Sequence, residues 1–300
     1  MSLSIRTRAP GLALAALLLG GALAPAQAFP GFNKPAAGNL QTDAVVAEID
    51  RALAEDRLVD AGRLLDRALA AGATDPRLML ESGELHLARG RLDDAVRSFT
   101  TAQASPGLRA RALQGRGVAL SRLGRSDEAI AVLQQAVQAD PTLWRAWNAL
   151  GAENDRQRGW TVAEAAYDKA LTAPGVGAEV YNNRGYSRLL QGRYPEASAD
   201  FVKALERDPA LDAARTNLRL SLALQGDYGR ATSVGAIDQR AAALNNAGFA
   251  ALLRGDFDQA EGLFNQAIEV QGKFYARAHE NLALARSLRS QAAAGRTATP

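Results

Sequence analysis

Two stretches of the chain carry paired asparagines in the same setting, and this residue type can hold a peptide backbone. Residues 181–197 read YNNRGYSRLLQGRYPEA and residues 244–260 read LNNAGFAALLRGDFDQA. Each stretch has an Asn-Asn pair and, three residues after the pair, an aromatic side chain. These residues are Asn182, Asn183, Tyr186, Asn245, Asn246 and Phe249. Because an amide both donates and accepts hydrogen bonds, asparagines can bind the N–H and C=O groups of an extended peptide, and aromatic rings add rigid contact area.

Residues that could support catalysis or bind a metal are scarce. The chain has two histidines, His86 and His279, and no cysteine, and neither histidine has a second histidine or cysteine at a metal-ligand spacing. The sequence contains no nucleophile elbow and no phosphate-binding loop. Gly115-x-Gly117 could be taken for a glycine-rich loop, but it lies within a predicted helix, where small residues permit close packing. We therefore expect a protein that is not an enzyme and that uses no metal or cofactor.

The composition favours helices and gives no electrostatic reason for binding nucleic acid. Hydrophobic residues make up 47% of the chain but aromatic residues only 6%, so the core must be built largely of alanine and leucine. Lys and Arg number 35 against 32 Asp and Glu. Loss of Arg6 and Arg8 with the N-terminal segment described next leaves 33 basic against 32 acidic residues, a net charge near +1. Binding to nucleic acid or to an anionic membrane surface is therefore not expected.

The N-terminus has the layout of a secretory signal peptide. Two arginines precede the apolar run GLALAALLLGGAL, and Ala26-x-Ala28 matches a signal-peptidase site. The alternative, a membrane anchor, is less favoured because the run is shorter than the roughly 20 residues that span a bilayer. The sequence thus predicts a signal peptide over residues 1–28, a flexible Pro- and Gly-containing linker over 29–41, and a periplasmic mature protein with no membrane span.

A fixed register runs through the rest of the chain. Glycines recur at intervals of 34, 68 and 34 residues, at Gly90, Gly124, Gly192 and Gly226. Arg158-Gly159 stands in the middle of the 68-residue interval. After each glycine come a small residue, a bulky one and a second small one, as in Ala95, Phe99 and Ala102. Residues at i, i+4 and i+7 share one face of a helix, and the glycine lets the chain reverse. Each unit is therefore a predicted helical hairpin whose small residues allow close approach and whose neighbours must stack to bury both faces.

This pattern resembles the tetratricopeptide repeat (TPR) family over residues 42–272, and the unit from Glu179 to Pro209 is nearly ideal. The resemblance implies an all-α fold, an α-solenoid of helical hairpins wound into a right-handed superhelix. It gives about six to seven units, a capping helix over 273–289 and a disordered tail over 290–300. The units are 42–74, 75–107, 108–141, 142–174, 178–209, 212–239 and 241–272. Two units depart from the pattern, since Asp56 stands where glycine is expected and Gly235 stands where a bulky residue belongs, so we expect a distortion in the latter.

In this family the first helix of each hairpin lines the concave groove, and its groove positions can be carried onto this sequence. They predict a partner-binding surface, an Arg and amide row followed by an Asn and aromatic row. The residues at these positions are Arg111, Gln114, Arg145, Asn148, Asn182, Asn183, Tyr186, Asn245, Asn246 and Phe249. Arginine would bind carboxylates in bidentate fashion. The partner expected from the resemblance is a protein or peptide.

The segment LDAARTNLRLSLALQGDYGRA, with the NNAGFAALLRGDFDQAEGLF that follows, is similar to the TPR proteins of Flp/Tad pilus assembly, the TadD type. This similarity implies an exported scaffold that serves an envelope pilus or secretion system, with secretin or pilus components as partners. Many proteins of that type are lipoproteins, whereas this chain has no cysteine to be lipidated. The alternative is a periplasmic adaptor for a protease or a peptidoglycan enzyme, which would use the same groove.

Overall fold

The structure, a computed structural model, describes residues 37–234, 239–271 and 275–297. The predicted signal peptide and the first part of the predicted linker lie outside these residues. The first helices of successive hairpins are α1 (Ala37–Ala54), α3 (Arg77–Ala88), α5 (Arg109–Arg122), α7 (Trp144–Arg156), α9 (Ala178–Leu190), α11 (Asp212–Gln225) and α13 (Arg240–Arg254). Their partners are α2 (Leu58–Ala70), α4 (Leu92–Ala102), α6 (Ser126–Ala139), α8 (Trp160–Thr172), α10 (Tyr194–Arg207), α12 (Tyr228–Ser233) and α14 (Phe257–Gln271). A 3-10 turn (Pro106–Leu108) precedes α5, and α15 (Ala276–Thr297) ends the array.

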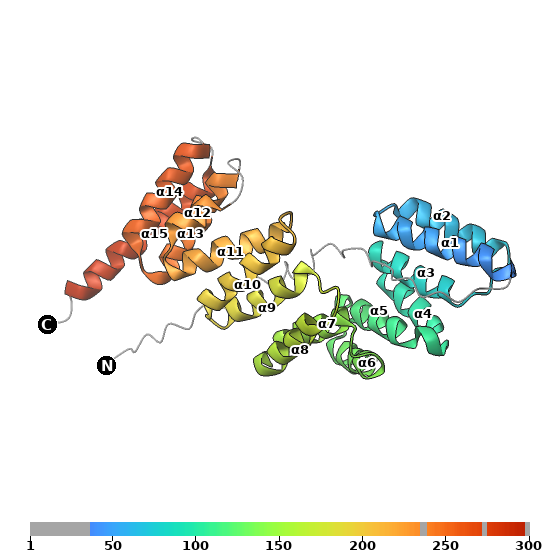
Figure 1. Ribbon diagram of the computed structural model, residues 1–300. Coiled ribbons are helices and arrows are strands. Elements are labelled where there is room, and N and C mark those ends of the chain that lie inside the picture. Colours follow the sequence, from blue (N-terminus) through green and yellow to red (C-terminus); the bar gives the residue numbers. More distant parts are fainter. Residues whose placement is uncertain (1–36, 235–238, 272–274, 298–300) are drawn as a thin grey trace.

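The hairpins stack into an open, curved array that runs from α1 at one end to α15 at the other (Figure 1). Each helix contacts its hairpin partner and the helix that follows. The first helices also contact one another directly, α1 with α3, α3 with α5 and so on to α13 with α15. No strand occurs in the part of the chain that the structure describes. The predicted fold, an all-α solenoid of helical hairpins, is confirmed, and its first helices form one continuous surface.

Glycines of the first helices receive aromatic rings from the second helices. A Cβ atom added at Gly151 would lie 2.5 Å from Cε1 of Tyr167, and one added at Gly185 would lie 2.8 Å from Cε1 of Phe201. Both rings are almost fully buried. Gly248 meets Phe264 in the same way, Gly115 meets Phe99 of the preceding hairpin, and Gly117 meets the aliphatic side chain of Leu133. Gly115 and Gly117 are therefore packing positions inside α5, as the sequence indicated, and the small residues of the register allow the two helices to approach closely.

The turn inside each hairpin needs a left-handed residue. Gly90, Gly124 and Gly192 take φ angles of 72°, 76° and 76° there, a conformation that glycine adopts without steric cost. At the corresponding place, Asp56 and Arg158 have φ angles of 53° and 58°. An L-residue with a side chain is strained in this region by about 1–2 kcal/mol. These two turns thus keep the left-handed conformation although their residue types disfavour it.

We expect Asp56→Gly and Arg158→Gly each to raise the free energy of unfolding by about 0.5–1 kcal/mol, because glycine removes the left-handed strain but adds entropy to the unfolded chain. Urea denaturation followed by circular dichroism measures this. Asp66→Gly, on the exposed side of α2, is the control and should destabilise by about 1 kcal/mol. If all three replacements destabilise the protein, Asp56 and Arg158 are not strained in the left-handed region.

Helix ends differ from the expected boundaries in two places. Helix α1 begins at Ala37, inside the segment expected to be a linker up to residue 41. No proline, which would disfavour helix, lies between Pro35 and the end of α1. Helix α15 continues to Thr297, past residue 289 where the capping helix was expected to end and into the expected disordered tail. The alanine-rich run after Ser290 explains this, because alanine has the highest helix propensity.

The unit of α11 and α12 is irregular, as its sequence indicated. Helix α12 has only six residues, and the backbone is extended at Val234, directly after it. Gly235, the residue that departs from the pattern, lies outside the described residues. Beside this short helix, Arg219 of α11 donates from Nε to the carbonyl of Val234 at 2.5 Å and from Nη2 to Gln239 at 3.0 Å. A guanidinium therefore bridges the place where a longer helix would pack.

Candidate functional site

A groove of about 1080 Å³ runs along the inner surface of the array. Its lining comes from α5, α7, α9, α11, α13 and α15, together with Leu211 and Gln239 beside them. Eight of the ten sequence-predicted site residues line it: Arg145, Asn148, Asn182, Asn183, Tyr186, Asn245, Asn246 and Phe249. Arg111 and Gln114 do not, because α5 reaches the groove only through its C-terminal part, at Val118, Ser121 and Arg122.

Four asparagine side chains form a hydrogen-bonded ladder across three first helices. Asn183 of α9 donates from Nδ2 to Oδ1 of Asn148 on α7 at 3.1 Å. Asn182 donates to Asn183 at 3.3 Å, and Asn217 of α11 donates to Oδ1 of Asn182 at 3.0 Å. These bonds use one N–H and one acceptor site of Asn182 and Asn183, and a primary amide has two of each. Among the described contacts, the second N–H and second lone pair of both amides stay available to a ligand.

A second, shorter amide ladder lies on the last two lining helices. Asn281 of α15 donates from Nδ2 to Oδ1 of Asn245 on α13 at 2.9 Å, and Asn245 donates to Asn246 at 3.5 Å. Asn245 is buried, whereas Asn246 is exposed. The two ladders are separated at the step from α11 to α13, where the short α12 interrupts the 34-residue register.

Asn217 and Asn281 were not among the predicted site residues. Asn217 stands 34 residues after Asn183, so the repeat period alone could have found it. Asn281 stands 36 residues after Asn245, and the stacking of α15 against α13 was needed to place it.

Aromatic and aliphatic side chains complete the middle of the groove. Tyr186 is 7% exposed and packs in the core cluster that joins α9 to α15. Burial raises the pKa of its hydroxyl above the ordinary value, so at neutral pH the group remains an O–H donor. Phe249 is partly buried against the same cluster, and Leu220 and Leu253 lie beside it in the lining. The groove therefore combines hydrogen-bonding amides with apolar contact area.

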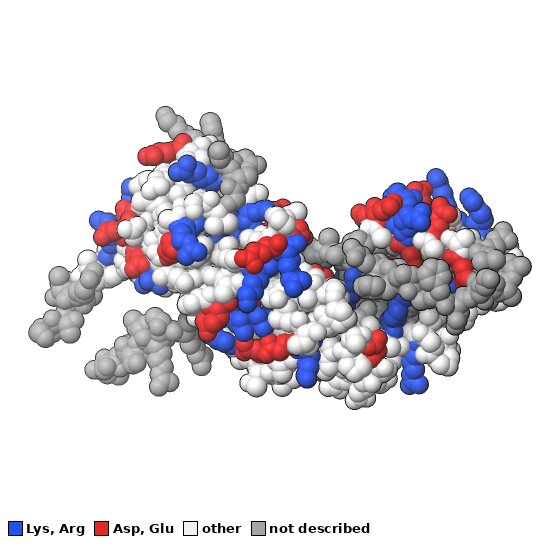
Figure 2. Space-filling model, viewed as in Figure 1, with Lys and Arg blue, Asp and Glu red and all other residues white. Residues whose placement is uncertain are grey.

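The groove carries more positive than negative charge. Five arginines line it, against two acidic residues: Arg122, Arg145, Arg156, Arg219 and Arg277, against Glu179 and Asp212. On the face shown in Figure 2, by contrast, basic and acidic side chains are interspersed. The excess of positive charge is thus a local property of the groove rather than of the protein, whose formal net charge is only +3.

Two of these arginines also link neighbouring hairpins, and a third is held by a ring on its own helix. Arg122 donates from Nη1 to the carbonyl of Leu87 at the end of α3, at 2.9 Å. Arg156 bonds Ser121 at 3.2 Å and forms an ion pair with Glu153, which is fully buried. Arg145 stacks on the ring of Trp144, with its guanidinium carbon 4.8 Å from the ring centroid. Their orientations are therefore set before any ligand arrives.

Near the N-terminal end, Arg111 lies close to the acidic residues Asp50, Glu81 and Glu84. Burial, and then a hydrogen bond that the protonated Glu81 carboxyl donates to the carboxylate of Asp50, raise the pKa of Glu81 to about 9. Burial also raises the pKa of Glu84, while the positive charges of Arg111 and Arg145 oppose that rise. Arg111 therefore faces carboxyl groups of its own chain and compensates them.

The raised pKa of Glu81 makes the pH dependence of stability testable. Because Glu81 has a higher pKa when folded than its ordinary value of 4.5, the folded state binds more protons between pH 4.5 and pH 9, and stability falls as pH rises through this range. A pKa difference of one between the folded and unfolded states corresponds to about 1.4 kcal/mol. We expect Glu81→Gln to be more stable than the parent at pH 8 by at least about this amount and to show a flatter stability profile. A parallel pair of profiles from urea denaturation between pH 5 and pH 9 would contradict the assignment.

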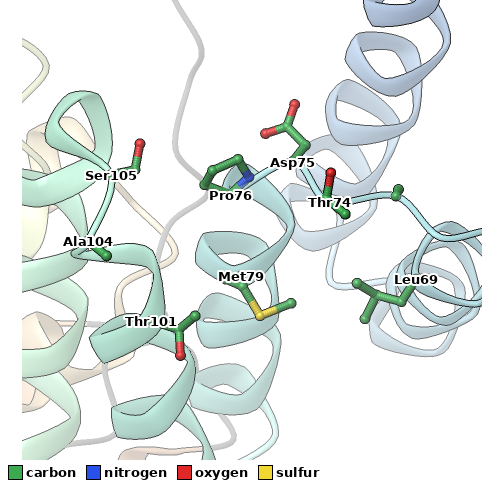
Figure 3. A pocket seen from close by; sticks show the side chains of 9 residues that line it. Leu69, Thr74, Asp75, Pro76, Met79, Thr101, Ala104 and Ser105 are labelled. Carbon is green, nitrogen blue, oxygen red and sulfur yellow. The ribbon is translucent and has the colours of Figure 1, made fainter.

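A second hollow, of about 420 Å³, lies between the loops that follow α2 and α4. Figure 3 shows Met79 extending from α3 toward Leu69, with Pro76 and Thr101 nearby. Its only charged lining residue is Asp75, which accepts hydrogen bonds from the backbone N–H and from Nε of Arg77 at 2.9 and 3.0 Å. With its carboxylate already engaged, this hollow offers a ligand mainly apolar contact.

The described residues contain no group of three His, Cys, Asp or Glu side chains that could hold a metal ion. Histidines 86 and 279 lie on α3 and α15, toward opposite ends of the array (Figure 1). In the same part of the chain, every helix is too short or too polar to cross a membrane.

Comparison with known proteins agrees with this architecture. Sequence models of the tetratricopeptide repeat match residues 80–143 and 178–211. No curated protein has significant sequence similarity to the chain. Similar solved structures include three TPR proteins that differ from this chain in most residues.

The TPR protein of Parabacteroides merdae is 18% identical, with a TM-score of 0.51, over 82% of this chain and 99% of its own. The C-terminal part of a TPR protein of Cytophaga hutchinsonii is 16% identical, with a TM-score of 0.56, over 79% and 99%. A TPR protein of Thermus thermophilus is 22% identical, with a TM-score of 0.54, over 60% and 98%. The family models identify tetratricopeptide repeats over the two matched segments, and the similar solved structures show that the chain has the all-α solenoid fold of such repeats.

Proposed function

We propose that this protein is a scaffold that binds an extended segment of a partner protein in the groove between α5 and α15. The observation that carries the proposal is the amide ladder of Asn148, Asn183, Asn182 and Asn217, which follows the groove from helix to helix. A stack of helices needs no such row of polar side chains on its inner surface, since apolar or solvated residues would serve as well. The ladder does present regularly placed donors and acceptors, which an extended peptide backbone requires.

The contacts around the ladder suit such a segment. The partly buried Phe249 offers rigid ring surface, which loses little conformational entropy when it is covered, and the largely buried Tyr186 supports the groove from behind. Because Tyr186 is held in the core and the amides are held by one another, the surface is largely pre-formed, and preorganisation reduces the free-energy cost of binding.

We further propose that the protein is exported, with residues 1–28 removed, and that it serves the assembly of an envelope pilus or secretion system. The signal-peptide layout and the similarity of the α11–α14 region to Flp/Tad pilus TPR proteins support this proposal. A periplasmic adaptor for a protease or a peptidoglycan enzyme would use the same groove and differ only in its partner. The partner's identity separates the two.

The double replacement Asn182→Ala with Tyr186→Ala is expected to weaken partner capture at least about tenfold, because it removes the centre of the ladder and its adjacent ring. The measurement is crosslinking and recovery from the native envelope with residues 29–300 as bait. Far-UV circular dichroism should show unchanged helicity in both proteins.

Asn154→Ala is the matched control, since this asparagine lies on α7, the helix of Asn148, but bonds the carbonyl of Leu150 at 2.8 Å and does not line the groove. It should capture as well as the parent. Equal capture by the double variant would place the binding surface elsewhere. Recovery of a secretin or pilus platform protein would support pilus assembly, whereas a protease or cell-wall hydrolase would support the adaptor.

A further inference from the structure

The spacing of the amide ladder restricts the conformation of its ligand. Successive rungs lie on successive first helices, namely α7, α9 and α11. Packed helices stand about 8–10 Å apart. A ligand that offers the same chemical group to each rung must therefore repeat about every 8–10 Å along its axis.

Among regular backbone conformations, polyproline II fits this repeat. It has three residues per turn and rises about 3.1 Å per residue, so its chemical face returns every ~9 Å. A β-strand returns to the same face every two residues, about 6.6–6.8 Å, and after three residues it presents the opposite face. An α-helix has no free backbone groups in its interior to bond the amides. Polyproline II leaves all its carbonyls unbonded.

The lining supports the same ligand by its side chains. Aromatic-lined grooves are a common docking surface for polyproline II segments, and here Tyr186 and Phe249 follow the amide pairs on α9 and α13. Of the five arginines in the lining, Arg156 is paired with the buried Glu153, and the other four against two acidic residues favour a negatively charged segment. Arg122 and Arg156 lie at one end of the groove and Arg277 at the other, on α15.

We infer that the groove binds a proline-containing, acidic segment of its partner in the polyproline II conformation, with one turn of the segment per first helix. This inference rests on the proposed function, since it specifies what the groove binds. Three residues per rung give one acidic side chain per turn when the acid occupies every third position. The spacing of the amide rungs along the groove, rather than the shape of a single pocket, then determines which segment binds.

The test uses three fluorescein-labelled peptides of equal length and measures their binding to residues 29–300 by fluorescence anisotropy. The first has five Pro-Pro-Glu triplets, the second five Pro-Pro-Lys triplets and the third five Gly-Ser-Glu triplets. The first is expected to bind most tightly. The lysine peptide should bind at least about tenfold more weakly because its charge is repelled, and the Gly-Ser-Glu peptide about tenfold more weakly because it must be ordered on binding.

Asn183→Ala should weaken the Pro-Pro-Glu peptide about fivefold, the effect of one lost hydrogen bond, whereas Asn154→Ala should leave it unchanged. Equal affinity for the Pro-Pro-Glu and Gly-Ser-Glu peptides would overturn the conformational inference, and preference for lysine would overturn the charge inference.

Competition distinguishes this inference from the function on which it rests. If capture of the native partner depends on Asn182 and Tyr186 and the Pro-Pro-Glu peptide displaces that partner, the inference is supported. If capture depends on those residues but the peptide neither binds nor displaces the partner, the groove binds another kind of segment and only the inference fails. If capture is independent of Asn182 and Tyr186, the proposed function fails as well.

Discussion

Replacing Asp200 by alanine is expected to lower the free energy of unfolding by about 3–5 kcal/mol. Asp200 is 1% exposed and accepts a bidentate pair from Arg184, with bonds of 2.9 Å from Nε and 2.6 Å from Nη2. It also accepts from Nη1 of Arg188 at 2.8 Å. Alanine would remove the buried anion that two largely buried guanidinium groups share and leave each with one more exposed carboxylate, Asp168 for Arg184 and Glu164 for Arg188. Removing the buried partner of an ion pair is strongly destabilising.

The same network supplies a control. Asp168 also bonds Arg184, at 2.7 Å, but its side chain is 60% exposed. Since exposed ion pairs contribute about 0–1 kcal/mol, Asp168→Ala should have a small effect. Urea denaturation of the two variants measures the difference. Similar small losses for both would mean that solvent reaches Asp200 and that the network does not hold the hairpins.

The network also joins two hairpins whose first helices line the groove. Arg188 and Arg193 donate to the two carboxylate oxygens of Glu164 on α8, each with a bond of 2.7 Å. The carboxylate thus connects the hairpin of α7 and α8 to that of α9 and α10. Asn148 and Asn183, which stand on these two hairpins, are kept in hydrogen-bonding register by it.

Phe201→Ala is the second replacement with a large expected effect, a loss of about 3–5 kcal/mol. The ring is fully buried and fills the space above Gly185. Removing it deletes buried apolar area and leaves a cavity between α9 and α10, which the backbone contact at the glycine cannot close.

A double-mutant cycle tests the packing directly. Gly185→Ala alone should destabilise by about 1–3 kcal/mol, because its Cβ would lie 2.8 Å from the ring of Phe201. In the Phe201→Ala background the same change should cost much less, since the added methyl group then enters the cavity. Additive effects in urea denaturation would contradict the ring-on-glycine contact.

Much of the fold could be predicted because packing fixes residue size at repeated positions. Phe201 and Gly185 must be large and small wherever a hairpin closes, so their register is visible in the sequence. At Arg158 the sequence showed only that glycine is missing from the turn. The left-handed backbone there follows from the stacking of the hairpins on both sides.

The groove was predicted less completely because side-chain partners depend on which helices meet. The amide pairs were found by residue type, and the period of the repeat could also have given Asn217. Arg111 was placed in the groove by register, yet it compensates Glu84 and Glu81. A single position cannot show whether an arginine faces a ligand or an acid of its own chain; the partner's location must be known.

The central claim is that the inner surface binds the partner, and site-specific photocrosslinking tests it most directly. A photoreactive amino acid would replace Thr216, an exposed groove residue on α11, or Val202, a 37% exposed residue on α10 outside the groove. Both variants would be expressed in the native cell and irradiated. The account predicts a covalent adduct with one partner from position 216 and none from position 202. An adduct from position 202 without one from position 216 would show that the partner binds the outer surface.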